Sequence, residues 1–122
     1  MTPEAAIYQL LSGFGIPAYA ATAVPDDAEY PYLTYSLTIG GWNDGDTNTT
    51  VNLWYKTSSE AVPNAKVREI GQTIGIDGLT VPCDGGMLFV KRGSPWAQPV
   101  QSTDDNTLKQ RYINIDIEFL VI

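Results

Sequence analysis

Hydrophobic residues recur at helical spacing in two stretches of the chain. Apolar side chains from Ile7 to Phe14 fall at i, i+3, i+4 and i+7, and Thr2 and Pro3 are typical of an N-cap and a first helical position. This pattern predicts a first helix that ends near the glycines at positions 13 and 15. A second helix is expected where apolar residues between Val62 and Ile74 share one face.

The start of the second helix is marked by small polar residues. Ser58 or Ser59 could cap it, and Pro63 is compatible only with its first turn. The segment between the two helices begins with residues 16–30, whose prolines and acids predict a short extended piece followed by a surface loop.

Strands are predicted where apolar and polar residues alternate with a period of two. Residues 32–39 and 49–56 alternate in this way and flank the polar, glycine-rich tip Gly40–Asn48, so we expect a long hairpin that could serve as an arm. Residues 79–83 and 87–91 flank Asp84-Gly85-Gly86, which is typical of a tight hairpin turn.

The end of the chain gives the clearest strand signal. Isoleucine, phenylalanine and valine at odd positions from 113 to 121 alternate with residues that are mostly polar or acidic. A long loop, Gly93–Thr107, is expected before it, because this stretch contains Pro95, Pro99 and an acidic pair. Together the elements predict one α+β domain over residues 1–122. It would consist of a single, mostly antiparallel β-sheet with about two α-helices packed on one face, plus the hairpin arm and the long loop.

Composition narrows the functional classes. Fourteen acidic and seven basic side chains give a net charge of −7, which repels the phosphate backbone of nucleic acids. The lone Cys83 excludes an intrachain disulfide and a cysteine metal cage, and we expect it to be a buried, inert thiol. No stretch approaches the roughly 20 apolar residues of a membrane span, so neither an anchor nor a standard secretion signal is predicted.

Catalytic chemistry has little support in these residues. The chain has no histidine, which removes the commonest general base and metal ligand, so we predict that it is not an enzyme and holds no cofactor. Asp116 and Glu118 share one strand face and leave a small hydrolase or binding module as an alternative. The spacing of Asp44, Asp46 and Asn48 starts like a calcium loop, but glycine and glutamate are missing at the two most demanding later positions, so no metal site is predicted.

Two tryptophans in predicted loops are candidates for protein contacts. Aromatic residues and arginine are enriched at the buried centres of interfaces, so Trp42, Arg92, Pro95 and Trp96 form a candidate interface. For Trp42 and Trp96, an interface anchor and ordinary loop packing are equally compatible with the sequence. Trp54 is expected to pack within the sheet.

Several short motifs taken in order resemble a known family. They are Asn52-Leu53-Trp54-Tyr55-Lys56-Thr57-Ser58-Ser59, Asp84-Gly85-Gly86, Val90-Lys91-Arg92-Gly93-Ser94-Pro95, Asp104-Asp105 and Arg111-Tyr112-Ile113-Asn114-Ile115. From about Pro31 to Ile122 this order resembles the tail-terminator or tail-completion (neck) proteins of long-tailed bacteriophages. The resemblance implies a virion structural protein, made in the bacterial host cytoplasm, that forms a hexameric ring at the head-proximal end of the tail tube. There it would end tube polymerisation and join the tail to the head.

The resemblance also implies partners and a role for the acids. The partners would be other copies of the chain, the major tail tube protein and the neck or head completion proteins, with DNA passing through unbound. A basic lining would trap a passing polyanion, so we expect acids to line the channel. The candidates are Asp44, Asp46, Asp104, Asp105, Asp116 and Glu118. A head-side neck protein, a stopper or adaptor of the connector, is the alternative within the same setting.

Overall fold

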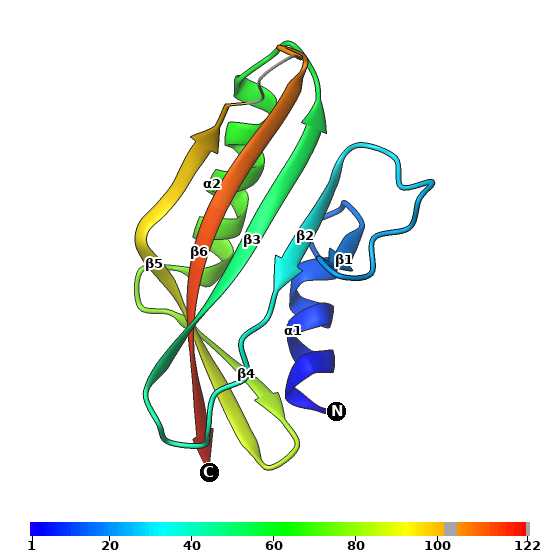
Figure 1. The fold of residues 1–122 in the computed structure, drawn as a ribbon. Helices are drawn as coiled ribbons and strands as arrows, with labels where there is room; N and C mark the ends of the chain where they lie inside the picture. The colour runs from blue at the N-terminus through cyan, green and yellow to red at the C-terminus, as the bar shows by residue number, and fades with distance from the viewer. Residues whose placement is uncertain (102–104, 122) are drawn as a thin grey trace.

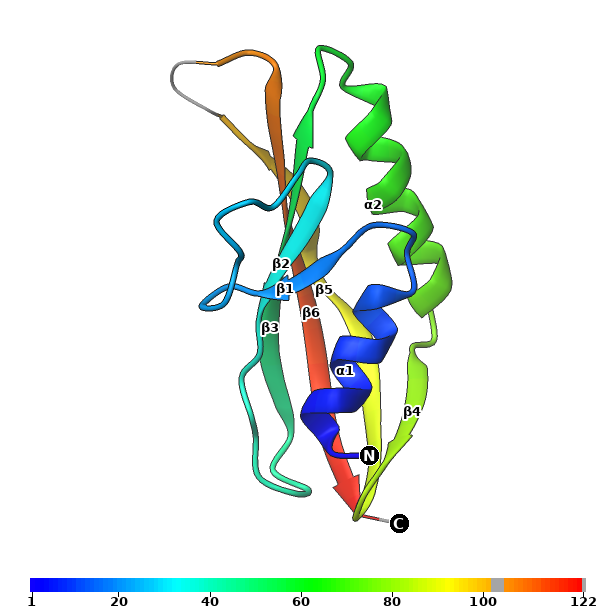
Figure 2. The ribbon, with the colours of Figure 1, turned by 90° about the vertical axis from the view of Figure 1, so that its right-hand side faces the viewer.

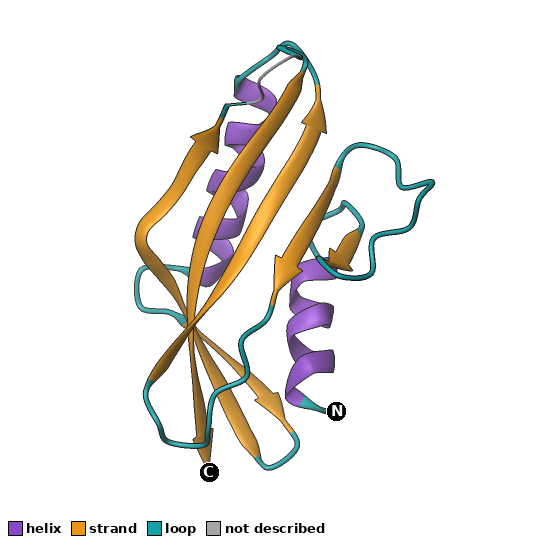
Figure 3. Cartoon of the chain, in the orientation of Figure 1, coloured by secondary structure: helices purple, strands orange, loops and turns teal. Residues whose placement is uncertain are grey.

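The chain forms a strongly twisted six-stranded sheet with two helices (Figures 1 and 3). The computed structural model describes residues 1–101 and 105–121. The helices are α1 (Pro3–Ser12) and α2 (Ala61–Ile74). The strands are β1 (Ala18–Ala20), β2 (Tyr32–Ser36), β3 (Asp46–Lys56), β4 (Leu79–Cys83), β5 (Gly86–Val100) and β6 (Leu108–Val121).

The strand order is β1-β2-β3-β6-β5-β4, and among the described strands the β1–β2 pair alone is parallel. This confirms the predicted α+β class with a mostly antiparallel sheet. The last strand along the chain, β6, lies in the centre, where β3 pairs with it from Asp46↔Glu118 to Lys56↔Leu108. The predicted hairpins are also present, as β2–β3 and β4–β5, although β2 ends earlier than predicted, at Ser36, and β3 begins earlier, at Asp46.

Both helices cover the same face of the sheet, as Figure 2 shows. Ile7 and Leu11 of α1 and Ile70 and Ile74 of α2 are almost fully buried in one core with the inward-facing residues of the strands. The sheet curls around α1, which contacts β1 at one edge and β4 at the other. In α1, Thr2 caps the helix as predicted, since its Oγ1 accepts a hydrogen bond from the Ala5 N–H at 3.1 Å.

The predicted start of the second helix is wrong by one or two residues. Glu60, and neither serine, is the N-cap of α2, and its side chain makes no capping hydrogen bond. Instead the Ser59 N–H donates to Thr57 Oγ1 at 3.1 Å. The serines therefore belong to a local turn that leads into the helix, which explains why their composition resembled a cap.

The predicted long loop over Gly93–Thr107 is also wrong in its first half, because β5 continues to Val100. Arg92 pairs with Ile115 and Ala97 with Ile113, so residues 93–96 form a bulge opposite Asn114. Gly93 is required at this point, since a Cβ there would lie 2.8 Å from that of Asn114. The bulge accommodates glycine and proline within a strand, and these were the residues that predicted a loop.

Candidate functional site

The face of the sheet that the helices leave uncovered is polar. In β3 and β6 the buried residues alternate with outward-facing ones, most of which are polar; Trp54 and Leu120 are the main exceptions. Toward one end of this outer face lie Asp46, Asp116 and Glu118, with a single cation among them. Lys91 Nζ is 2.7 Å from Asp46 Oδ1 and 3.0 Å from Glu118 Oε1, and these hydrogen bonds raise the pKa of the lysine. The outer face therefore carries an excess of negative charge at this end.

The structure brings together some of the acids proposed for the channel and separates others. Asp46 and Glu118 are direct partners across β3 and β6, and Asp116 accepts a hydrogen bond from Asn48 Nδ2 at 3.3 Å. Asp44 lies in the exposed turn just before β3. Asp104 lies outside the described residues.

Asp105 belongs to the opposite end of the molecule. It precedes β6, so along that strand it is about 40 Å from Glu118. Its carboxylate binds Lys56 Nζ at 2.5 Å and accepts hydrogen bonds from the Thr107 N–H and Oγ1, and these contacts depress its pKa. Asp105 thus stabilises its own turn and is not part of the acidic cluster on the sheet.

Four aromatic side chains form a row across one end of the sheet, which their spacing along the chain does not indicate. Trp54 stacks on Tyr32 with ring centroids 6.5 Å apart, and Tyr32 also contacts Tyr19 and Tyr30. The Trp54 indole donates a hydrogen bond to Thr34 Oγ1 at 3.0 Å, as befits a tryptophan packed within the sheet. The row crosses β1, β2 and β3, so it could be predicted only once the order of these strands in the sheet was known.

Trp42 packs on its own chain. Its ring meets Phe119 edge-on, with centroids 6.1 Å apart and planes at 84°, and it lies over Gly85 and Gly86 in the β4–β5 turn. The neighbouring Asn43 N–H donates to the Phe119 carbonyl at 2.7 Å. The tip of the β2–β3 hairpin is therefore held against the end of β6, although Trp42 stays 40% exposed.

The other three candidate interface residues lie together at the bulge. Along β5 every second side chain faces the helices, as Leu88 and Val90 do. Arg92 is the next in this series, so it lies on the side of the sheet that carries α2. Pro95 is exposed, whereas Trp96 is half buried and its indole lies against Gly71 of α2. Arg92 and Trp96 line a hollow of about 380 Å³ between α2 and β5, together with Arg68. Arg68 was not singled out from the sequence.

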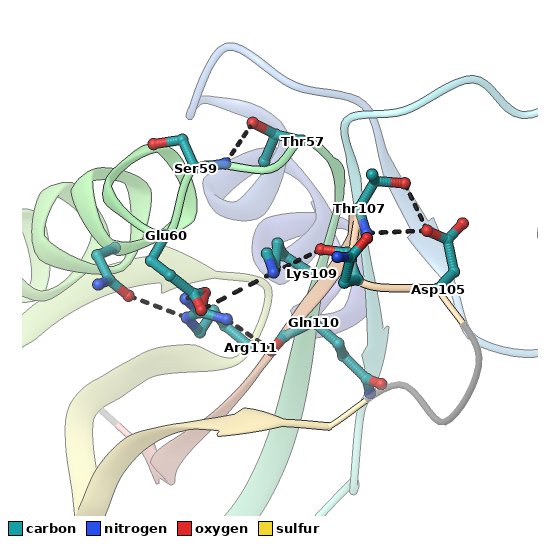
Figure 4. A network of polar contacts seen from close by, with 10 residues as sticks. Thr57, Ser59, Glu60, Asp105, Thr107, Lys109, Gln110 and Arg111 are labelled. Carbon is teal, nitrogen blue, oxygen red and sulfur yellow. Dashed lines mark hydrogen bonds and ion pairs between the residues drawn. The ribbon is translucent and has the colours of Figure 1, made fainter.

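A buried arginine at the far end of β6 was also missed (Figure 4). Arg111 donates to Asn64 Oδ1 at 2.9 Å and to Glu60 Oε1 at 2.8 Å, while Lys109 approaches the same glutamate at 3.9 Å. The arginine thereby lowers the pKa of Glu60 and joins the start of α2 to the sheet. Its position was accessible from the sequence, since it has the same odd parity as the inward isoleucines of the last strand.

Residues 1–101 and 105–121 contain no cluster of three or more potential metal ligands and no helix long and apolar enough to cross a membrane. The two carboxylates considered for hydrolysis lie on the uncovered face of the sheet. Asp116 accepts a hydrogen bond from Asn48, and Glu118 accepts one from Lys91. Cys83 is partly rather than fully buried, and desolvation raises the pKa of its thiol, which opposes nucleophilic reactivity.

The comparisons with known proteins show likeness in fold. No protein-family model and no curated protein matches the sequence. A chain in a solved structure described as "Virion of native gene transfer agent (GTA) particle" superimposes with a TM-score of 0.68 and 14% identity. The match covers 95% of this chain and 92% of that one. The two chains therefore share their fold over nearly their whole lengths.

Proposed function

We propose that this protein is a structural component of a phage-like virion and acts by assembly rather than by catalysis. The observation that carries the proposal is the fold match to a chain of a gene transfer agent virion, which spans almost all of both molecules. The motif order that resembles tail-terminator proteins supports it independently. The lack of histidine removes the usual general base and fits a protein without an active site.

Within the virion, the proposed role is that of a ring subunit at the head-proximal end of the tail tube. Such a ring would stop tube polymerisation, join tail to head and let DNA pass. One end of the outer face suits the channel wall, because Lys91 is the one described cation that contacts Asp46, Asp116 or Glu118 there, whereas Lys56 lies at the other end of β3 and pairs with Asp105. A wall of this charge would repel phosphate and let the duplex slide. The two helices would then lie toward the outside of the ring.

The experiment is to mix the purified chain with tail tube protein and, separately, with portal or connector protein, and to follow assembly by native mass spectrometry and electron microscopy. Closed rings that cap tubes are expected, with the outer face of the sheet toward the lumen. Binding to the portal or connector protein, without binding to tail tube protein, would favour the alternative that the chain is a head-side neck protein. A chain that stays monomeric in every mixture would refute the assembly proposal, and rings with all the outer-face acids on the external wall would refute the channel assignment.

A further inference from the structure

Two arginines stand apart from the other cations of the chain. Lys56, Lys66, Lys91, Lys109 and Arg111 each form an ion pair. Arg68 and Arg92 form none with any residue in the described ranges, and both line the hollow between α2 and β5. In a molecule with twice as many acids as bases, two cations beside a half-buried tryptophan are an uncommon surface.

The chemistry of this surface suits a carboxylate-bearing partner. Asn64 and Gln72 complete its polar rim, and no acidic side chain among the described residues lines it, although Asp77 lines the adjoining hollow that shares Arg92 and Trp96. Guanidinium groups bind carboxylates through paired hydrogen bonds, and an aromatic ring next to them supplies apolar contact area. We name this set, Arg68, Arg92 and Trp96 with their rim, the arginine hollow.

The backbone around the arginine hollow disfavours recognition by strand addition. Among the described residues β4 pairs only with Gly86–Val90, so the later part of β5 is an open edge of the sheet as described. This edge carries the bulge as well as Pro95 and Pro99, which lack N–H donors. Bulges and prolines protect an edge against pairing with another strand. A partner here is therefore recognised through side chains.

A complementary acidic segment lies at the opposite edge of the same molecule. The loop between β1 and β2 carries Asp26, Asp27 and Glu29, which are all exposed and form no ion pair with described residues. Local turns hold the loop, since the Ala28 N–H donates to the Pro25 carbonyl at 3.1 Å. Figure 1 shows this loop projecting from the side of the sheet that is remote from β5.

The two surfaces lie at the same level of the sheet. One row of paired residues crosses it as Ala20, Tyr35, Val51, Ile113 and Ala97. The acidic loop follows the first residue of this row, and the bulge precedes the last. A neighbour related by rotation alone could therefore present its loop to the arginine hollow. Such a head-to-tail contact closes a ring when it is repeated.

We propose that the arginine hollow of one subunit binds the acidic 26–29 loop of the next, as the repeating contact of the ring. This inference rests on the proposed function and names the contact by which the subunits would associate. The partner is a second copy of this chain, selected by opposite charge at opposite edges. Complementary charges of this kind also fix the orientation of neighbouring subunits, because a reversed neighbour would bring two acidic loops or two arginine hollows together.

The test uses two charge-reversed variants, Arg68→Glu/Arg92→Glu and Asp26→Arg/Asp27→Arg. Each alone should associate at least about tenfold more weakly than wild type, because each opposes like charges across every contact. Mixed in equal amounts they should assemble again, since every contact then pairs opposite charges. Native mass spectrometry should find alternating composition. Rescue in the mixture also shows that both variants are folded.

The control variant Glu4→Arg/Asp84→Arg makes the same change in net charge as Asp26→Arg/Asp27→Arg, lies outside both surfaces and should assemble like wild type. Association of the separate variants at wild-type strength, or a mixture that fails to assemble, would overturn the inference while leaving the proposed function standing. The wild-type sample reports on the ring itself, and a wild type that never forms a ring would refute both.

Discussion

The contact of Trp42 with the end of β6 can be tested by the substitution Trp42→Ala. A large aromatic side chain buries up to about 250 Å², and since Trp42 is 40% exposed, roughly 150 Å² of its surface is covered. At about 25 cal/mol per Å² this burial corresponds to just under 4 kcal/mol, or about 2 to 3 kcal/mol once a compact unfolded state is allowed for. Urea unfolding followed by far-ultraviolet circular dichroism should show a loss of that size, which lowers the midpoint by about 1 to 2 M.

Two control variants separate this effect from a general response to mutation. Trp42→Phe keeps an aromatic ring against Phe119 and should lose less than half as much stability. Ile76→Ala removes a side chain from a residue that is 87% exposed and should change stability by less than about 0.5 kcal/mol. If Trp42→Ala also stayed within about 0.5 kcal/mol, the tryptophan would not hold the hairpin tip. The reasoning that assigns it to packing within its own chain would then fail.

Two further predictions concern glycines with positive φ and the loss of stability at acid pH. Gly78→Ala should lower the free energy of unfolding by at least about 2 kcal/mol, because Gly78 has φ +86° and a Cβ there would lie 2.5 Å from Phe89 Cε1 and 3.0 Å from the Val90 carbonyl oxygen. Gly45→Ala, at φ +89° with open space, should cost only about 1 kcal/mol, and equal losses on thermal unfolding would contradict this. The hydrogen bond from Arg111 lowers the pKa of the Glu60 carboxyl below its ordinary 4.5. The ion pair therefore stabilises the fold fully above the unfolded-state pKa, and this contribution is lost as the pH falls through the pKa of the folded state. Melting curves of wild type and Glu60→Gln should differ at pH 7 and converge toward pH 3, and a constant difference would argue against it.

Local periodicity was sufficient to predict most of the fold. The apolar faces of both helices and the alternation along β6 reflect burial by a single core, so they are visible without knowledge of the partners. The short extended piece expected within residues 16–30 is β1, but its parallel pairing with β2 could not be predicted in this way, because that pairing depends on residues that are distant in the chain. The continuation of β5 was missed since Gly93 and Pro95 usually end a strand, and only the opposing Asn114 shows that a bulge carries it onward.

The candidate surfaces were predicted less completely than the fold, because they are assembled across strands. Arg92 and Trp96 were identified from residue type, but Arg68 joins them only through the packing of α2 on β5. Asp46, Asp116 and Glu118 form one cluster because β3 and β6 pair in a particular register. The excess of acidic residues predicted an acidic surface. That Asp105 lies at the other end of β6, away from this cluster, became visible only in the three-dimensional structure.

The central position of β6 has a consequence for how the protein reaches its native state. Its two neighbours, β3 and β5, cannot complete their ladders until Leu108–Val121 has been synthesised, and the pairing with β3 spans up to 72 positions along the chain. Such non-local pairing makes folding slow and leaves apolar strands open to association in the meantime. Nascent chains should therefore depend on protection from aggregation until the final strand docks, and subunits should enter an assembly only as completed molecules.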